Sequence, residues 1–364
     1  MKVLIFANNA SGLISFRREL LEQLVKNKEE VYCCTPPSDV TKTIEAIGCH
    51  VISVEMDRHG TNPFQELKLI GTYRNILREI KPDIVFTYTI KCNAYGGIAC
   101  AMQKIPYVAN VTGLGTAIEN GGLMQKISLF LYKMGLRKAQ KVFFQNTENR
   151  DFMLAHGAVK GAYDMLPGSG VNLDRFTTYP YPEGDTVDFV FIARIMKEKG
   201  IEQYLDAAKV IRARHPETRF HICGFCEQNY QGRLEELSDS GVIIYHGMVE
   251  DMTKIYRMIS CTVHPTYYPE GLSNVLLESA ASGRPIITTD RSGCREVIDN
   301  GVNGFIVRQK DSDDLIDKIE KFLSLSLEER KAMGLAGRAK VEAEFDRKIV
   351  IQKYLDEVKA AGKV

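Results

Sequence analysis

The sequence has no long apolar run, no excess of one charge and no segment that resembles a signal peptide. No run approaches the roughly 18 consecutive apolar residues that a membrane-spanning helix needs. The first strand-like run, Val3 to Ala7, is too short for the apolar core of a signal peptide. The 47 Lys and Arg residues nearly balance the 46 Asp and Glu residues, which excludes a strongly polyanionic partner for the whole molecule. We therefore expect a cytoplasmic protein that does not bind nucleic acid.

Motifs for disulfides, metals and the common nucleotide cofactors are also absent. The nine cysteines are scattered, and the one close pair, Cys223 and Cys226, has no second pair or neighbouring His to complete a zinc site. Neither a His-Glu-x-x-His helix nor a P-loop occurs. The loop after the first strand-like run has one glycine, Gly12, where a dinucleotide fingerprint has three. This argues against NAD and FAD, and leaves either a plain turn or an anion site at the following helix N-terminus.

The composition is that of a globular protein: 45% of the 364 residues are apolar and 26% are charged. At roughly 150 residues per domain, this length predicts two domains. β-rich runs alternate with helical-period segments throughout, which is typical of α/β domains with parallel sheets. The turn-rich stretch 167–188 predicts an interdomain linker. We expect an N-terminal domain over residues 1–166 and a C-terminal domain over residues 167–344.

The expected strands follow from the short β-rich runs. In the first half they are Lys2–Ala7, Glu30–Cys34, His50–Val54, Asp83–Tyr88, Tyr107–Val111, Lys141–Gln145 and Ala162–Leu166. In the second half they are Val187–Ala193, Arg219–Cys223, Val242–His246, Cys261–His264, Pro285–Thr288 and Phe305–Val307. Helices are expected between them, including Pro63–Ile80, Asn93–Gln103 and Leu123–Ala139, and three more from Asp313 onward.

Two cations, Arg194 and Lys199, follow a predicted strand and precede a predicted helix. Ligands of parallel-sheet domains bind beyond the carboxyl ends of the strands. Arg together with Lys can neutralise a diphosphate there without a metal ion. Surface charge on a loop is the alternative.

Two carboxylates, Glu270 and Glu278, enclose seven residues after another predicted strand. If the segment were helical throughout, eight steps would place them roughly 12 Å apart, about the distance from a nucleotide's ribose to a sugar beyond its diphosphate. The backbone N–H groups at the helix start would face the phosphates. The residues expected near that helix start are Leu272, Ser273 and Asn274, and Gly271 is a further expected donor contact.

Taken in order, these motifs resemble those of the retaining glycosyltransferases of family 4. The resemblance rests on the Arg-x4-Lys loop, on Pro269–Glu278 and on the following Ala-Ala-Ser-Gly-Arg-Pro-Ile. It continues through Gly293–Ile298 and Asn303-Gly-Phe, and upstream through Gly168–Phe176. It implies the GT-B architecture, with two facing Rossmann-like domains, an interdomain cleft and a last helix, about residues 345–364, that packs back onto the first domain.

The resemblance also implies roles for the site residues. Arg194 and Lys199 would bind the donor diphosphate, Glu278 the ribose hydroxyls and Glu270 the donor sugar, while Gly12 would face the diphosphate. Members of this family commonly use a nucleotide-diphosphate sugar, need no bound metal and retain the anomeric configuration. UDP is the first candidate nucleotide, and no cofactor is expected.

On the acceptor side, the stretches Ile90–Gly96 and Val111–Gly115, with Asn62-Pro-Phe, resemble enzymes that add hexosamines to polyprenyl-diphosphate-linked oligosaccharides. Many family members have a histidine in this region, whereas here the loop is Asn110-Val-Thr-Gly-Leu-Gly. Lys91 and Asn93 are candidate acceptor contacts, with a surface Lys and a buried structural Asn as the alternatives. The remaining acceptor-side candidates are Thr112 and Gly113.

The first half of the chain is the more basic, partly through a helical stretch that also carries apolar residues. Its cations are Lys126, Lys133, Arg137 and Lys138, and its apolar residues include Leu129, Phe130, Leu131 and Tyr132. A basic amphipathic helix can rest on an anionic membrane, and a solvated helix face is the alternative. For a lipid-linked acceptor we expect peripheral contact with the inner face of the cell membrane.

Two other functions are compatible with the same architecture. A nucleotide-sugar 2-epimerase would need neither an acceptor nor a membrane. A non-catalytic nucleotide-sugar-binding protein would be expected to lose one of the cations or carboxylates, and all four are present. Glycosyl transfer is therefore the favoured function.

Overall fold

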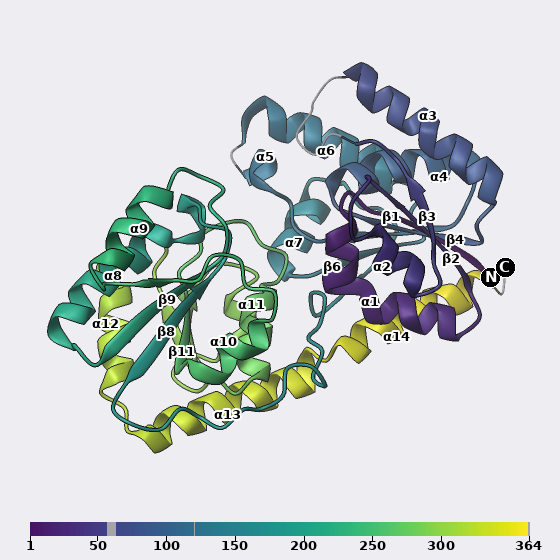
Figure 1. Cartoon of the computed structure of the whole chain (residues 1–364). Helices are drawn as coiled ribbons and strands as arrows, with labels where there is room; N and C mark the ends of the chain where they lie inside the picture. Colours follow the sequence, from purple (N-terminus) through teal and green to yellow (C-terminus); the bar gives the residue numbers. More distant parts are fainter. Residues whose placement is uncertain (57–62, 120, 363–364) are drawn as a thin grey trace. The chain divides into compact units, whose positions relative to one another are not determined.

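The computed structural model describes residues 1–56, 63–119 and 121–362, and the chain forms two compact units (Figure 1). The first unit comprises Met1–Ser169 together with Lys348–Val364, and the second comprises Gly170–Arg347. Each unit is a parallel β-sheet with helices. The predicted α/β fold class is thus confirmed. Asn62, part of the acceptor-side resemblance, lies outside the described residues.

The sheet of the first unit has seven strands in the order β3-β2-β1-β4-β5-β6-β7, and all neighbours are parallel. The strands are β1 (Lys2–Phe6), β2 (Glu30–Thr35), β3 (His50–Ser53), β4 (Ile84–Tyr88), β5 (Tyr107–Val111), β6 (Lys141–Phe144) and β7 (Ala162–Met165). Every residue of β4 and β5 is buried, as expected for central strands of a parallel sheet covered on both faces. The strand order reverses between β1 and β4, which makes this the topological switch point.

Helices of the first unit fall between these strands, and one comes from the far end of the chain. They are α1 (Ala10–Lys26), α2 (Thr41–Ala46), α3 (Pro63–Ile80), the π-helix η1 (Cys92–Gly96), α4 (Gly97–Gln103), α5 (Thr116–Glu119), α6 (Gly122–Leu136), α7 (Thr147–Ala155) and α14 (Arg347–Ala361). In α14, Tyr354 is fully buried and its hydroxyl accepts a hydrogen bond of 2.7 Å from Asn110 of β5. An ion pair between Lys141 and Glu357 adds to this contact. The last helix therefore belongs to the first unit's core.

The sheet of the second unit has six strands in the order β10-β9-β8-β11-β12-β13. The strands are β8 (Val187–Ile192), β9 (Thr218–Cys223), β10 (Ile244–Tyr245), β11 (Cys261–His264), β12 (Ile286–Thr289) and β13 (Gly304–Val307). Its helices are η2 (Lys197–Lys199), α8 (Ile201–Arg214), α9 (Gln231–Asp239), α10 (Met252–Met258), α11 (Asn274–Ala281), η3 (Arg295–Val297), α12 (Ser312–Leu323) and α13 (Leu327–Glu344). The switch point lies between β8 and β11.

Several expected elements differ from those in the structure. The strand predicted over 242–246 is reduced to the two residues of β10. The helix predicted over 93–103 begins as the π-helix η1, and the one predicted over 123–139 ends at Leu136. The short helix α2 was not predicted, because six residues are too few for a clear helical period.

Candidate active site

The loops after β8 and β11 meet at the carboxyl edge of the second sheet. The backbone N–H of Tyr267 donates a hydrogen bond of 2.9 Å to the carbonyl of Glu198, which ties one loop to the other. A Cβ atom on Gly200 would lie 2.2 Å from the carbonyl oxygen of Pro265. Gly200 also has a φ of 81°, which favours glycine. The two loops approach closely because this position has no side chain.

An ion pair joins the ammonium of Lys199 to the carboxylate of Glu270 at this edge. Only 10% of the Lys199 side chain and 20% of the Glu270 side chain are exposed. Burial by itself would raise the pKa of Glu270, but the adjacent Lys199 charge outweighs it and lowers the pKa below its usual value. Glu270 is therefore a carboxylate at neutral pH.

Arg194 lies beside the same aromatic ring as Lys199. The guanidinium carbon of Arg194 is 5.3 Å from the centre of the Tyr268 ring, and the ammonium of Lys199 is 4.7 Å from it. Arg194 also forms an ion pair of 2.5 Å with Glu227 in a more exposed position. The structure thus brings together both predicted cations, and it adds Tyr268 and Glu227, which the sequence pattern did not single out.

The helix after Glu270 begins where it was expected, near Ser273 and Asn274. Helix α11 starts at Asn274 with Ser273 as its N-cap, so Glu270 lies in the preceding loop. The estimate of roughly 12 Å from eight helical steps is therefore wrong, because only the second half of that segment rises as a helix. The loop is held by the backbone N–H of Ser273, which donates to the carbonyl of Gly293 at 2.8 Å. A Cβ on Gly293 would lie 2.8 Å from that of Glu270, so this glycine leaves room for the carboxylate residue.

Glu278 lies on α11, one turn beyond the helix start. The Tyr256 hydroxyl is 3.4 Å from its carboxylate. Burial raises the pKa of Glu278 to about 7, although the charges of Arg347 and Arg175 act in the opposite direction. Its protonation state therefore changes close to neutral pH.

Two polar atoms near this edge are buried without a partner among the described residues, Oδ1 of Asn274 and Nδ1 of His264. Burial, with a smaller effect of the Lys199 charge, lowers the pKa of His264 to about 3, so its ring is neutral. The other ring nitrogen lies 3.3 Å from the Ser273 hydroxyl. Orphaned polar atoms of this kind are uncommon in protein cores and are typical of ligand sites. Of the remaining predicted residues, Gly271 and Leu272 are buried in the loop before Ser273.

In the first unit, Gly12 lies in the first turn of α1, at the carboxyl end of β1. Asn9 caps this helix through a hydrogen bond of 3.0 Å from the N–H of Ser11. A Cβ on Gly12 would meet only the Asn9 side chain, at 3.9 Å. Nothing within the unit therefore requires a glycine here, and its predicted contact with a diphosphate stays a prediction.

The acceptor-side candidates separate into buried and accessible residues. Asn93 is completely buried, where its side chain accepts from Thr87 at 2.7 Å and donates to the carbonyl of Asn110 at 2.8 Å. This corrects the prediction of an acceptor contact, because the amide is already used inside the unit. Thr112 and Gly113 are partly exposed in the loop after β5.

Lys91 forms an ion pair of 2.5 Å with Glu66. Both residues line a hollow of about 580 Å³ at the carboxyl ends of β2 and β3. Ser53, Glu55 and Lys68 also line it. The rest of the lining is largely apolar, including Val54 and Leu69. Charged and hydroxyl groups thus share with apolar side chains the lining of a space large enough for a sugar.

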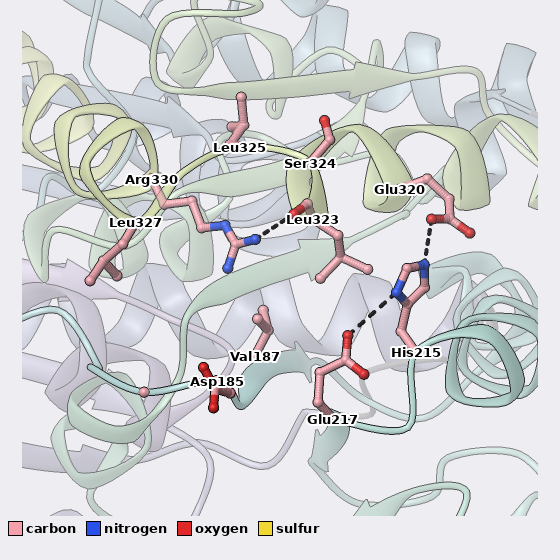
Figure 2. Close-up of a pocket in the computed structure, with 11 residues that line it drawn as sticks. Asp185, Val187, His215, Glu217, Glu320, Leu323, Ser324, Leu325, Leu327 and Arg330 are labelled. Carbon is pink, nitrogen blue, oxygen red and sulfur yellow. Dashed lines mark hydrogen bonds and ion pairs between the residues drawn. The ribbon is translucent and has the colours of Figure 1, made fainter.

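A larger hollow of about 710 Å³ lies elsewhere in the second unit (Figure 2). It is lined by Val187 at the amino end of β8 and by His215 just before β9. Figure 2 shows His215 between two carboxylates, with Glu320 at 2.7 Å and Glu217 at 3.4 Å. Because Arg194 and Lys199 follow the carboxyl end of β8, this hollow lies at the opposite edge of the sheet.

Within residues 1–56, 63–119 and 121–362, no three His, Cys, Asp or Glu side chains are grouped so that they could hold a metal ion. In the same part of the chain, no helix combines the length and the apolar composition needed to cross a membrane.

Two family models match the chain, one in each unit. The model described as "Glycosyl transferase 4-like" matches residues 2–146, and the model described as "Glycosyl transferases group 1" matches residues 181–340. Solved glycosyltransferases share the fold over the whole chain. The chain therefore belongs to the glycosyltransferases of the GT-B fold, which confirms the predicted family and enzyme class.

Among the relatives, a Campylobacter jejuni protein is 28% identical over 98% of this chain and 97% of its own length. Its name is N,N'-diacetylbacillosaminyl-diphospho-undecaprenol alpha-1,3-N-acetylgalactosaminyltransferase. The capsular polysaccharide biosynthesis glycosyltransferase CapM of Staphylococcus aureus is 26% identical over 93% of this chain and 92% of its own.

Two solved structures illustrate the shared fold. A glycosyltransferase from Rickettsia africae has a TM-score of 0.82 and 17% identity, over 100% of this chain and 98% of its own. HepE from Anabaena, solved in complex with UDP-glucose, has a TM-score of 0.79 and 16% identity, over 99% of this chain and 100% of its own.

Proposed function

We propose that this chain is a retaining glycosyltransferase that moves a sugar from a UDP-sugar to a polyprenyl-diphosphate-linked glycan in surface glycan assembly. The observation that carries the proposal is the gathering of Arg194, Lys199 and Glu270 at the switch point of the second sheet, where doubly wound sheets bind nucleotides. The name of the Campylobacter relative supports the acceptor class. The UDP-glucose complex of HepE supports the donor.

The two cations give the donor diphosphate a binding site that needs no metal ion. As the bond to the sugar breaks, negative charge grows on the leaving diphosphate, and Arg194 and Lys199 stabilise that charge more strongly than they stabilise the intact donor. Both lie against the Tyr268 ring. In the free protein Arg194 is paired with Glu227 and Lys199 with Glu270, so the diphosphate shares both cations with carboxylates when the donor binds.

The two carboxylates have separate tasks in this proposal. Glu278, beside Tyr256, accepts hydrogen bonds from the ribose hydroxyls. Glu270 accepts hydrogen bonds from the donor sugar, and its charge favours the oxocarbenium-like transition state. In the free protein the Lys199 ion pair holds Glu270 ionised and in place. The diphosphate then shares Lys199 with Glu270.

The proposed acceptor site is the charged hollow of the first unit. Lys91, Glu66 and Glu55 line it, and a glycan's hydroxyl groups can both donate to such carboxylates and accept from the ammonium. Because Lys91 is paired with Glu66, it is oriented before an acceptor arrives. Asn93 has no part in the proposed acceptor site.

We also propose that helix α6 rests on the membrane that holds the acceptor. Five large apolar side chains of α6 are exposed: Leu123 by 72%, Met124 by 45%, Ile127 by 43%, Phe130 by 61% and Met134 by 42%. Spacings of four, three and four residues place all of them except Met124 on one helix face. The opposite face packs in the unit's core through Leu129, Tyr132 and Leu136.

This arrangement corrects which apolar residues are available to the membrane. Of the four residues expected from the sequence, Leu129 and Tyr132 are buried and only Phe130 is largely exposed. The cations next to the exposed stripe are all solvent-accessible: Lys126, Lys133, Arg137 and Lys138. An apolar stripe flanked by cations fits the boundary between acyl chains and anionic headgroups.

A transfer assay tests the proposed function. The chain is incubated with UDP-N-acetylhexosamines and a short polyprenyl-diphosphate-linked saccharide, and the products are identified by mass spectrometry and by NMR of the new anomeric centre. We expect one added sugar and a retained configuration. Conversion of the donor alone into an epimer would identify a 2-epimerase instead, and tight UDP binding without any product would identify a binding protein.

A further inference from the structure

Arg17, on helix α1, is a buried cation at the switch point of the first sheet. Only 4% of its surface is exposed. Helical side chains tilt towards the N-terminal end of their helix, and α1 begins at the carboxyl end of β1. The guanidinium therefore points towards the carboxyl edge, where its carbon lies 5.0 Å from the ring of Tyr88, the last residue of β4. The ring of Tyr354 lies 5.9 Å away on α14.

The charge of Arg17 has no anionic partner in the part of the chain that the structure describes. Its guanidinium donates one hydrogen bond to the carbonyl of Phe16, at 2.7 Å, and its Nε is buried without an acceptor. The nearest other polar group is the Tyr88 hydroxyl, which interacts with the guanidinium. A guanidinium has five N–H donors, so one carbonyl and one hydroxyl leave it incompletely satisfied.

A second buried arginine shows how this chain satisfies such a group when the role is structural. Arg284 is only 1% exposed. Its guanidinium donates to four carbonyl oxygens, at 2.6 to 3.4 Å. Arg17 lies against two aromatic rings with one such bond, so burial of Arg17 is compensated far less completely.

The neighbours of Arg17 are also weakly satisfied. The hydroxyls of Tyr88 and Thr89 are buried without a hydrogen bond of good geometry among the described residues, and their nearest polar groups are Arg17 and Tyr354 for Tyr88 and the Cys92 thiol for Thr89. Thr89 has a φ of 71°, a conformation that a β-branched residue rarely adopts and that is often retained for function. The chain continues directly into the π-helix η1, and π-helical turns occur frequently at functional sites.

We propose that Arg17 and the Tyr88 hydroxyl bind a phosphate or diphosphate group of a substrate. Arginine binds phosphate through two parallel N–H bonds, and the Tyr88 O–H supplies a further donor. The position fits, because ligands of doubly wound sheets bind outside the carboxyl ends at the switch point. In naming a substrate phosphate the inference rests on the proposed function, since both the nucleotide sugar and a polyprenyl-diphosphate acceptor carry a diphosphate.

Calorimetry with inorganic pyrophosphate tests the site without any need for activity. The full chain first receives Arg194→Ala and Lys199→Ala, which remove the cations of the donor site. Pyrophosphate should bind this background, and adding Arg17→Gln should weaken the binding by about tenfold or more. Tyr88→Phe should weaken it severalfold. The matched control is Arg18→Gln, since Arg18 is exposed and paired with Glu22, and it should change nothing.

Pyrophosphate binding that is absent from the folded background, or equal for Arg17→Gln and Arg18→Gln, would overturn the proposal. Thermal unfolding of each variant shows whether it is folded. If Arg17→Gln does not fold, Tyr88→Phe and Arg17→Lys take its place. Arg17→Lys keeps the charge but not the paired N–H geometry, so a merely structural charge predicts unchanged pyrophosphate binding and the proposed site predicts weaker binding.

Two further measurements identify the phosphate's source in the chain with Arg194 and Lys199 intact. Weaker UDP binding by Arg17→Gln would assign the nucleotide sugar. Unchanged UDP binding with a raised KM for the lipid-diphosphate acceptor would assign the acceptor. A folded variant that changes neither would count against the site. If neither the wild type nor any variant transfers a sugar, while pyrophosphate binding still depends on Arg17, the proposed function is contradicted and the phosphate site is not.

Discussion

The ammonium of Lys199 is held by the carboxylate of Glu270, although one residue follows β8 and the other follows β11. Both side chains are largely buried, so each compensates a charge that would be costly alone. The pair also lies where we propose that the donor diphosphate and its sugar meet. Replacing either residue should therefore affect both stability and catalysis, and the two effects can be measured separately.

Replacing Lys199 by Ala should lower turnover by roughly a hundredfold or more, the cost of removing a charge that stabilises a transition state. It should also lower the melting temperature, since Glu270 loses its partner. Adding Glu270→Gln should restore much of the stability without restoring turnover. The control is Lys197→Ala, because Lys197 is an exposed cation in the same short helix η2. Unchanged turnover in a folded Lys199→Ala variant would place this pair outside the active site.

Replacing Glu270 by Ala and replacing Glu278 by Ala should change different kinetic constants. Glu278 contacts a part of the donor that does not react, so its loss should chiefly raise the KM for the donor. Glu270 lies beside the reacting sugar, so its loss should chiefly lower kcat. UDP, which lacks the sugar, should bind Glu270→Ala almost normally and Glu278→Ala weakly. Calorimetry on both variants decides the matter, and the reverse order of UDP affinities would exchange the two assignments.

Glu278 should also make stability and UDP binding depend on pH. Its pKa of about 7 in the folded chain is higher than in the unfolded chain, so the folded state holds a proton that the unfolded state releases. The contribution to stability is fully present at low pH and is lost as pH rises through 7. The stability of Glu278→Gln relative to wild type should therefore increase between about pH 5 and pH 8. A constant difference in chemical unfolding free energy would show that Glu278 does not titrate in this range.

Over the same range the carboxylate form becomes available to the ribose hydroxyls. Wild-type affinity for UDP should rise relative to that of Glu278→Gln. Comparing the two proteins cancels the titration of the UDP phosphate itself, because that contribution is common to both. Parallel pH profiles would contradict a ribose contact by Glu278.

The strand segments and the parallel α/β class were the parts of the fold most accessible from sequence. Runs such as Val187–Ile192 are apolar or buried on both faces, which is the pattern of a central parallel strand. The start of α11 near Ser273 and Asn274 was also predicted correctly, and Ser273 is its N-cap. The predicted separation of Glu270 and Glu278 was wrong, because it treated the loop before Ser273 as helical.

Other features depend on tertiary contacts that no local pattern contains. The Lys199–Glu270 pair and the Tyr268 contacts join loops about seventy positions apart. Helix α6 has apolar residues on two faces, so the spacing of apolar residues in its sequence does not indicate which face covers the core. A contact between the Gly135 backbone and the Tyr107 hydroxyl, at 2.7 Å, helps to settle that orientation.

Transfer should continue in excess EDTA, because Arg194 and Lys199 supply the positive charge that a metal ion gives other transferases. Initial rates with and without the chelator should agree within experimental error. The control is a parallel assay with added magnesium. Activity that is lost in EDTA and restored by magnesium or manganese would contradict the metal-independent proposal.

The membrane proposal predicts weak, salt-sensitive binding to vesicles of phosphatidylglycerol and phosphatidylcholine. Each cation near such a surface contributes about 1 kcal/mol and is screened by salt, so neutralising Lys126, Lys133, Arg137 and Lys138 together should abolish co-sedimentation. Replacing Phe130 and Ile127 by Ser should also weaken binding, by removing apolar area from the membrane boundary. The matched control is Leu335→Ser, since Leu335 is 56% exposed on α13 of the other unit. Equal sedimentation of the quadruple variant and wild type would show that this face of α6 is simply solvated.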